Sequence, residues 1–123
     1  MRILVCGGRT WGYTPESNYK ERDIEQFNCG LDYLKRLNPV CVISGGAKGA
    51  DELGPMLSDL LRRESKVFRA DWKKHGKAAG PIRNKQMLDK GKPDLVVAFP
   101  GGSGTSNMVK QAREAGVEVL VVE

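Results

Sequence analysis

The chain has 123 residues, of which 40% are hydrophobic, and this is enough for the core of one domain spanning residues 1–123. Its 20 lysines and arginines outnumber its 15 acidic residues, and the resulting charge of +5 permits anionic ligands without demanding nucleic acid, since no run of like charges forms a basic tail. No segment has the roughly 18 apolar residues of a membrane span, and the apolar residues 1–6 are too few for a signal peptide, so we expect a cytoplasmic protein with no membrane partner.

Five apolar runs, most of them continuous, alternate with helical patterns along the chain. The first helical pattern covers residues 19–37, where apolar side chains recur close to every 3.6 residues, and Asn18 and Glu21 have the spacing of a capping box. The second covers residues 51–64, where Asp51 suits the N-cap. The apolar runs, which we predict to be strands, are residues 3–6, 40–43, 66–68, 94–99 and 117–122.

Two further helices are predicted in the second half of the chain. One begins at Pro81, because proline is favoured at the first helical position, and ends before Gly91. The other runs from about Ser106 to Ala115, and Gly116 caps its carboxyl end.

The alternation of strands and helices predicts an α/β fold, a three-layer Rossmann-like domain with about five parallel strands and right-handed crossovers. The expected strand order is 3-2-1-4-5, and 2-1-3-4-5 is the alternative. The carboxyl ends of parallel strands lie at one edge of the sheet, where ligands of open α/β sheets bind. Four loops are expected to meet there, at residues 6–18, 44–50, 69–80 and 99–105.

Glycine-rich segments follow three of the predicted strands. In PGGSGTS, at residues 100–106, glycines let the backbone approach a ligand closely, and the helix that follows offers free N–H groups to a phosphate or another anion. A glycine-rich turn without a ligand is the alternative. SGGAKGAD, at residues 44–51, repeats the pattern without the spacing of a Walker P-loop. In CGGR, at residues 6–9, the planar guanidinium of Arg9 can donate two parallel hydrogen bonds to a phosphate.

Residues 70–88 carry the polar side chains on which a reaction could depend. Asp71 is expected at the end of the third strand, His75 is the only histidine, and Arg83 falls in the first turn of the helix predicted from Pro81. These three are candidate catalytic residues, although a solvated loop residue is the alternative for His75. The candidate ligand- and phosphate-binding residues are Gly7, Gly8, Arg9, Ser44, Gly45, Gly46, Lys48, Arg83, Asn84, Pro100, Gly101, Gly102, Ser103, Gly104 and Thr105.

The three cysteines are Cys6, Cys29 and Cys41. Their odd number and the lack of a CxxC spacing argue against a disulfide framework and against a metal cluster. We therefore expect three buried or half-buried thiols, no bound metal and no cofactor.

Four segments together resemble the SLOG superfamily, which unites the Lonely Guy phosphoribohydrolases with the Rossmann-like domain of DNA-processing protein A. Within it, they are most similar to the small-protein branch related to YspA, whose function is uncharacterised. The resemblance covers nearly the whole chain and, because members commonly pair through helices, it implies a homodimer or a higher homo-oligomer. The segments are GGR at residues 7–9, SGGAKGAD at 44–51, ADWKKHGKAAGPIRNKQML at 70–88 and PGGSGT at 100–105.

The Lonely Guy resemblance implies cleavage of the N-glycosidic bond of a nucleoside monophosphate, carried by an arginine and a downstream PGGxGTxxE loop. Arg83 and Met87 stand where that family has its arginine and its methionine, and residues 100–105 match the glycine loop. The glutamate has no match, because Met108 takes its place. A methionine side chain neither ionises nor accepts a strong hydrogen bond, so the resemblance implies a nucleotide-like ligand more directly than it implies a reaction.

Three functions are compatible with these segments. The favoured one is a sensor or sequestering protein that binds a nucleotide or a nucleotide-derived phosphorylated ligand, since binding needs the glycine loops and arginines but no glutamate. The alternative is an enzyme that hydrolyses the N-glycosidic or phosphate bond of a nucleotide-like substrate, with Asp71 or His75 in place of the glutamate. Single-stranded nucleic-acid binding, in which Trp11 and Tyr13 could stack on bases or instead pack beneath their loop, is the least favoured.

Overall fold

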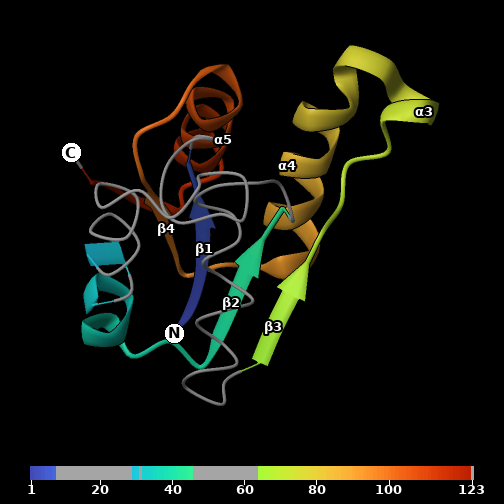
Figure 1. The fold of residues 1–123 in the computed structure, drawn as a ribbon. Coiled ribbons are helices and arrows are strands. Elements are labelled where there is room, and N and C mark those ends of the chain that lie inside the picture. Colours follow the sequence, from blue (N-terminus) through green and yellow to red (C-terminus); the bar gives the residue numbers. More distant parts are fainter. Residues whose placement is uncertain (8–28, 31, 46–63, 123) are drawn as a thin grey trace, which may run out of the picture.

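The computed structural model describes residues 1–7, 29–30, 32–45 and 64–122, and the strands among them form one parallel five-stranded sheet (Figure 1). Its order is β3-β2-β1-β4-β5, which confirms the predicted Rossmann-like fold with order 3-2-1-4-5 and excludes the alternative order. The strands are β1 Arg2–Cys6, β2 Cys41–Ser44, β3 Glu64–Val67, β4 Leu95–Ala98 and β5 Glu118–Val121.

The central strand, β1, is buried on both of its faces. Leu4 lies in register between Ile43 of β2 and Val96 of β4. Ile3, Leu4 and their neighbour Val5 are completely buried, as expected for a continuous apolar strand in the middle of a parallel sheet. The edge strands β3 and β5 are more exposed. The sequence of β3, ESKV, places charged side chains on an edge, which discourages pairing with another chain.

Helices cover the two faces of the sheet. On one face, residues 29–30 and 32–37 are helical, within the helix predicted over residues 19–37, and Leu34 is buried in the same cluster as Val42 and Phe99. On the other face lie α4, Ala79–Gly91, and α5, Ser103–Glu114 (Figure 1). The sheet therefore separates two apolar clusters, as a three-layer architecture requires.

Helix α4 begins two residues earlier and ends later than the sequence predicts. A short 3-10 turn, η3 Gly76–Ala78, runs directly into it, so Pro81 occupies the third rather than the first helical position, where a missing N–H is still harmless. Gly91 is the last helical residue, and a Cβ there would lie only 3.1 Å from Cδ1 of Ile43 in β2. The glycine thus permits close helix–sheet packing, and Lys92, with φ 51°, ends the helix.

The segment predicted as loop 69–80 contains a further helical turn, α3, Trp72–His75. Asp71 is its N-cap rather than the end of a strand, and its carboxylate accepts from the backbone N–H of Lys74 at 3.1 Å. At the other end of the chain, α5 begins at Ser103 instead of Ser106. Gly116, with φ 76°, follows this helix in the left-handed conformation predicted for its cap.

Two predicted features lie outside the described residues. They are residues 51–63 of the helix predicted over 51–64, with Asp51 as its N-cap, and the capping box of Asn18 and Glu21. Glu64, the last residue of that predicted helix, instead begins β3. Among the helices that are described, none is long and apolar enough to cross a membrane.

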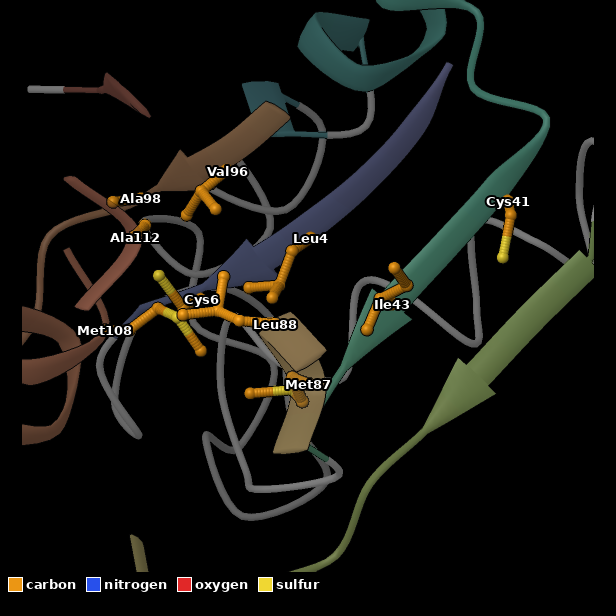
Figure 2. Packing of buried hydrophobic residues seen from close by; sticks show 10 residues of the cluster. All are labelled: Leu4, Cys6, Cys41, Ile43, Met87, Leu88, Val96, Ala98, Met108 and Ala112. Carbon is orange, nitrogen blue, oxygen red and sulfur yellow. The ribbon is translucent and has the colours of Figure 1, made fainter. Parts of the chain in front are cut away.

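The cluster beneath α4 and α5 is shown in Figure 2. Leu4 and Cys6 of β1 project from the sheet toward Met87 of α4 and Met108 of α5, which are 2% and 0% exposed. These two methionines join both helices to the central strand. The full cluster comprises Leu4, Cys6, Cys41, Ile43, Met87, Leu88, Val96, Ala98, Met108 and Ala112.

The three thiols differ in exposure. Cys6 and Cys41 are buried in the sheet, whereas Cys29 is exposed on its helix, so the expectation of three buried or half-buried thiols is wrong for Cys29. The reason is its place on the outward side of a surface helix, next to the buried Gly30.

Thiol labelling at neutral pH is expected to modify Cys29 rapidly and to modify Cys6 and Cys41 only as the protein unfolds. Burial raises the pKa of the Cys41 thiol, and the charge of Glu64 adds to this effect, while the charges of Arg2 and Lys66 oppose it. The neutral thiol is therefore favoured in the folded state. This contribution to stability is fully present below the unfolded pKa of about 8.5 and is lost as pH rises through the higher folded pKa. Peptide mapping of the labelled protein checks the order of modification, and rapid labelling of Cys41 would contradict it.

Candidate functional site

The carboxyl ends of β1, β2 and β4 meet at one edge of the sheet. The ladder of hydrogen bonds continues one step beyond the strands, since the N–H of Phe68 donates to Ser44 O and that of Phe99 donates to Cys6 O, both at 2.9 Å. Beyond these bonds the chain emerges at this edge, with Gly45 after β2 and residues 100–102 after β4. The predicted convergence of strand ends is thereby confirmed for the described residues.

The N-terminus of α5 stands at this edge. Gly102 is its N-cap and supplies no side-chain hydrogen bond, while its carbonyl accepts from the N–H of Ser106 at 3.1 Å. Ser103, Gly104 and Thr105, predicted in a loop, instead form the first helical turn, so their N–H groups have no acceptor within the helix. The first turn contains no acidic side chain. Its unpaired N–H groups and the positive end of the helix dipole favour an anion.

Arg83, on the first turns of α4, reaches across to β2. Its Nη1 donates to the carbonyl of Gly45 at 2.8 Å, and its Nε donates to Oδ1 of Asn84 at 3.1 Å. A guanidinium has five N–H donors. Within the part of the chain that the structure describes, the second N–H of Nη1 and both N–H groups of Nη2 have no hydrogen-bond partner. The guanidinium is therefore fixed in place, and its remaining N–H groups make no hydrogen bond to the described residues.

Asn84 connects Arg83 to α5. This side chain is 3% exposed, and its Nδ2 donates to Gly104 O at 3.3 Å and to Oδ1 of Asn107 at 3.1 Å. Asn107 also accepts from Nε2 of Gln111 at 2.7 Å. The buried amide is thus satisfied on both of its ends, which fixes the orientation of Arg83 relative to the N-terminus of α5.

Asn107 and Gln111 complete this arrangement but were not among the candidates from the sequence. Nε2 of Gln111 also donates to the carbonyl of Pro81 at 3.1 Å, which ties α5 to the start of α4. Their spacing of i, i+4 places them on one side of a helix, and this is the signal that could have revealed them.

Ser44, a predicted binding residue, ends β2 and is 0% exposed. Its hydroxyl is buried without a hydrogen-bond partner among the described residues. An unpaired buried hydroxyl costs about 1–3 kcal/mol, so the serine hydroxyl remains available to a group that enters this edge next to Gly45.

Asp71 and His75 do not belong to the group around Arg83. They lie on α3, which packs against α4 and which Figure 1 shows on the side of α4 away from α5. The carboxylate of Asp71 is exposed and caps α3, and the N–H of His75 donates to the carbonyl of Asp71. The structure therefore brings neither of these candidate catalytic residues to Arg83.

Several candidates from the sequence lie outside the described residues: Gly8, Arg9, Gly46, Lys48, Trp11 and Tyr13. Gly7 follows β1 directly at the same edge, and Pro100 and Gly101 are exposed in the turn before α5. The residues that the structure does bring together are Gly45, Arg83, Asn84 and Gly104. Among the described residues, no group of three or more His, Cys, Asp or Glu side chains could hold a metal ion.

Met108 lies one turn beyond the glycine segment and faces the core. It is 0% exposed and packs in the cluster with Cys6 and Met87 (Figure 2). The position that matches the Lonely Guy glutamate is therefore an apolar packing position, and its side chain supplies no carboxylate to Arg83.

A groove of about 700 Å³ runs along the outer side of α5, beside the ends of β4 and β5. We call it the α5–β5 groove. Pro100, Gly101, Thr105 and Ser106 line one end of it. Its other lining residues include Phe99, Val109, Lys110, Arg113, Glu114 and Val121. The candidate anion site at the start of α5 thus opens into this groove.

Comparisons with known proteins find similarity both in sequence and in structure. The chain is 34% identical to the Gene 61 protein of Mycobacterium phage D29 over 128 aligned positions, which cover 97% of this chain and 94% of that protein. No protein-family model matches the chain. Among solved structures, it is similar to DNA processing protein A from Streptococcus pneumoniae, with a TM-score of 0.66 and 18% identity.

This structural match covers 99% of the chain and 50% of the Streptococcus protein, so the chain spans half the length of that neighbour. At 18% identity the match shows a shared fold. It is the fold that the resemblance to the SLOG superfamily implies.

Proposed function

This chain belongs to the family of the Gene 61 protein of Mycobacterium phage D29, and we propose that it binds a nucleotide or a nucleotide-derived phosphorylated ligand at the carboxyl edge of its sheet. The observation that carries the proposal is the geometry of Arg83. Its guanidinium is held by Gly45 and Asn84, beside the N-terminus of α5, and it keeps donors free of the described residues. The guanidinium and the positive end of the α5 dipole, two independent sources of positive potential, therefore lie side by side.

In this proposal the protein binds the ligand without cleaving it, and acts as a sensor or as a sequestering protein. Met108 supports this role over hydrolysis, because a buried thioether stands where the Lonely Guy reaction needs a carboxylate. The assignment to the YspA-related branch belongs to the same proposal.

A thermal-shift screen with AMP, ADP-ribose, NAD and cyclic nucleotides tests the binding. Ligand that binds only the folded state raises its stability by RT ln(1 + [L]/Kd), which is about 2.7 kcal/mol at a hundredfold excess over Kd. No shift with any of them would remove the proposal. Chromatography of the same mixtures tests the alternative enzymatic function, since cleaved ligand would argue for a hydrolase.

Replacing Gly104 by alanine is expected to separate stability from binding. A Cβ at this helical position meets nothing within 4 Å, so stability stays equal or rises by up to about 1 kcal/mol. The added methyl group lies at the start of α5, where a phosphate would approach, so affinity for AMP falls. Thermal unfolding and calorimetric titration of the same sample check both effects. Unchanged affinity would show that the ligand does not approach this glycine.

Single-stranded nucleic acid is a second candidate, favoured by one surface feature. Trp72 is 51% exposed, and the exposed lysines Lys73, Lys74 and Lys77 follow it in the sequence. Stacking on an aromatic ring among cations is a common way to bind single strands. The name of the structural neighbour, DNA processing protein A, points in the same direction, although the sequence disfavours this function. Steep salt dependence of oligonucleotide affinity would support it, and its absence together with tight mononucleotide binding would oppose it.

A further inference from the structure

We propose that the α5–β5 groove is a second subsite, and that the ligand class is a 5′-phosphorylated dinucleotide unit rather than a mononucleotide. This inference rests on the proposed function, because its first phosphate is the one held at the start of α5. Beyond that first phosphate, the proposed ligand has a nucleoside and a second phosphate, which bind at successive positions along the groove.

The first argument is continuity. Gly101, Thr105 and Ser106 line both the start of α5 and one end of the groove. A ligand whose phosphate binds the N–H groups of the first turn can therefore extend directly along the outer side of the helix. The volume of about 700 Å³ falls within the range of small-molecule sites, about 300–1,000 Å³.

The second argument is the apolar middle of the groove. Val109 of α5 is half-buried, and Val121 of the edge strand β5 is 52% exposed. Phe99, which follows β4, lines the groove from a buried position, since it is only 1% exposed. A large exposed valine beside other apolar side chains is a surface that a flat nucleobase or a sugar can cover.

The third argument is the position of two cations. Lys110 and Arg113 are exposed, line the groove, and have no ion-pair partner among the described residues. The rise of an α-helix places their backbones about 7.5 Å and about 12 Å beyond Thr105. Two phosphates separated by a nucleoside bridge this length directly, whereas the adjacent phosphates of a nucleoside diphosphate would be reached only if both side chains fold back toward Thr105. Glu114 at the far end repels an anion, which limits the ligand to the part of the groove before it.

Affinities for pApA, ApA and AMP, measured by calorimetry at one salt concentration, test this proposal. We expect pApA to bind at least tenfold more tightly than AMP, which lacks the second phosphate, and than ApA, which lacks the first. Equal affinities of pApA and AMP would overturn the second subsite and leave the proposed function intact. No binding of either would overturn both. A 5′-phosphorylated tetranucleotide distinguishes a free dinucleotide from the end of a strand, because only a strand-end site binds it as tightly as pApA, and both results support the subsite.

Variants locate the second phosphate. The double substitution Lys110→Gln and Arg113→Gln is expected to reduce affinity for pApA about tenfold or more and to leave affinity for AMP unchanged. The matched control, Lys85→Gln with Lys90→Gln on the exposed side of α4, removes the same charge away from the groove and should change neither affinity. An equal loss in both double variants would reduce the effect to general electrostatics and overturn the assignment.

Discussion

Replacing Met108 by glutamate is expected to destabilise the folded protein by about 3–5 kcal/mol at neutral pH, because an unpaired buried carboxylate is among the costliest substitutions. A domain of this size has a total stability of about 5–15 kcal/mol. Met108 is 0% exposed and surrounded by apolar side chains from the sheet and α4. The substitution restores the PGGxGTxxE pattern, yet it should produce a poorly folded protein and no hydrolase.

The pH dependence distinguishes charge from shape. Burial raises the pKa of the introduced carboxyl above its unfolded value of about 4.3. The deficit is therefore smallest below that pH and grows as pH rises through the folded pKa, which urea unfolding at pH 4.5 and 7.5 would show. Met108→Leu should cost less than about 1.5 kcal/mol at both pH values. Wild-type stability of the glutamate variant at pH 7.5 would show that position 108 can face the ligand, and would revive the enzymatic alternative.

Replacing Arg83 by glutamine is expected to weaken binding of AMP about 10- to 150-fold. Hydrogen bonds to a charged partner contribute about 1.5–3 kcal/mol, and tenfold in affinity corresponds to about 1.4 kcal/mol. The substitution also leaves the buried carbonyl of Gly45 without its donor, so a loss of about 1–3 kcal/mol in stability accompanies it.

Two further variants make this result specific. Arg83→Lys keeps the charge but cannot reproduce the fork that joins Gly45 and Asn84, so it should bind with intermediate affinity. Arg36→Gln removes an exposed arginine from the helix on the other face of the sheet and should not affect AMP. Calorimetric titration of the three variants checks the order, and wild-type affinity in Arg83→Gln would exclude the guanidinium from the site.

The fold could be predicted from the sequence because the apolar runs of a parallel sheet are continuous. The residues of β1 and β4 are buried on both faces, and this requirement is visible in ILVC and LVVA. Helix starts were less predictable. Pro81 is tolerated throughout a first turn, so it did not locate the start of α4, and α3 is too short to show a helical period.

The candidate site was predictable where backbone and charge decide it, and not where side chains meet across helices. The glycine segment before α5 and Arg83 in α4 follow from motif and topology. The role of Asn84 as a connector depends on Asn107 and Gly104, which are 23 and 20 residues away and meet it only after α4 and α5 have packed. Met108 was recognised from the sequence as a departure from the PGGxGTxxE pattern. Its burial in the core, however, could be known only from the fold.

The central position of β1 has a consequence for how the protein folds. The N–H of Arg2 donates to the carboxylate of Asp94 at 2.7 Å, across 92 residues of sequence. A chain whose middle strand must find partners so distant makes many of its contacts between residues far apart in sequence, and such topologies fold more slowly than helical bundles, whose contacts are local. The start of α5 and the end of β2 adjoin only when β1 has been enclosed between its neighbours. Ligand binding is therefore expected to appear in the last kinetic phase of refolding, together with protection of the β1 amides from hydrogen exchange.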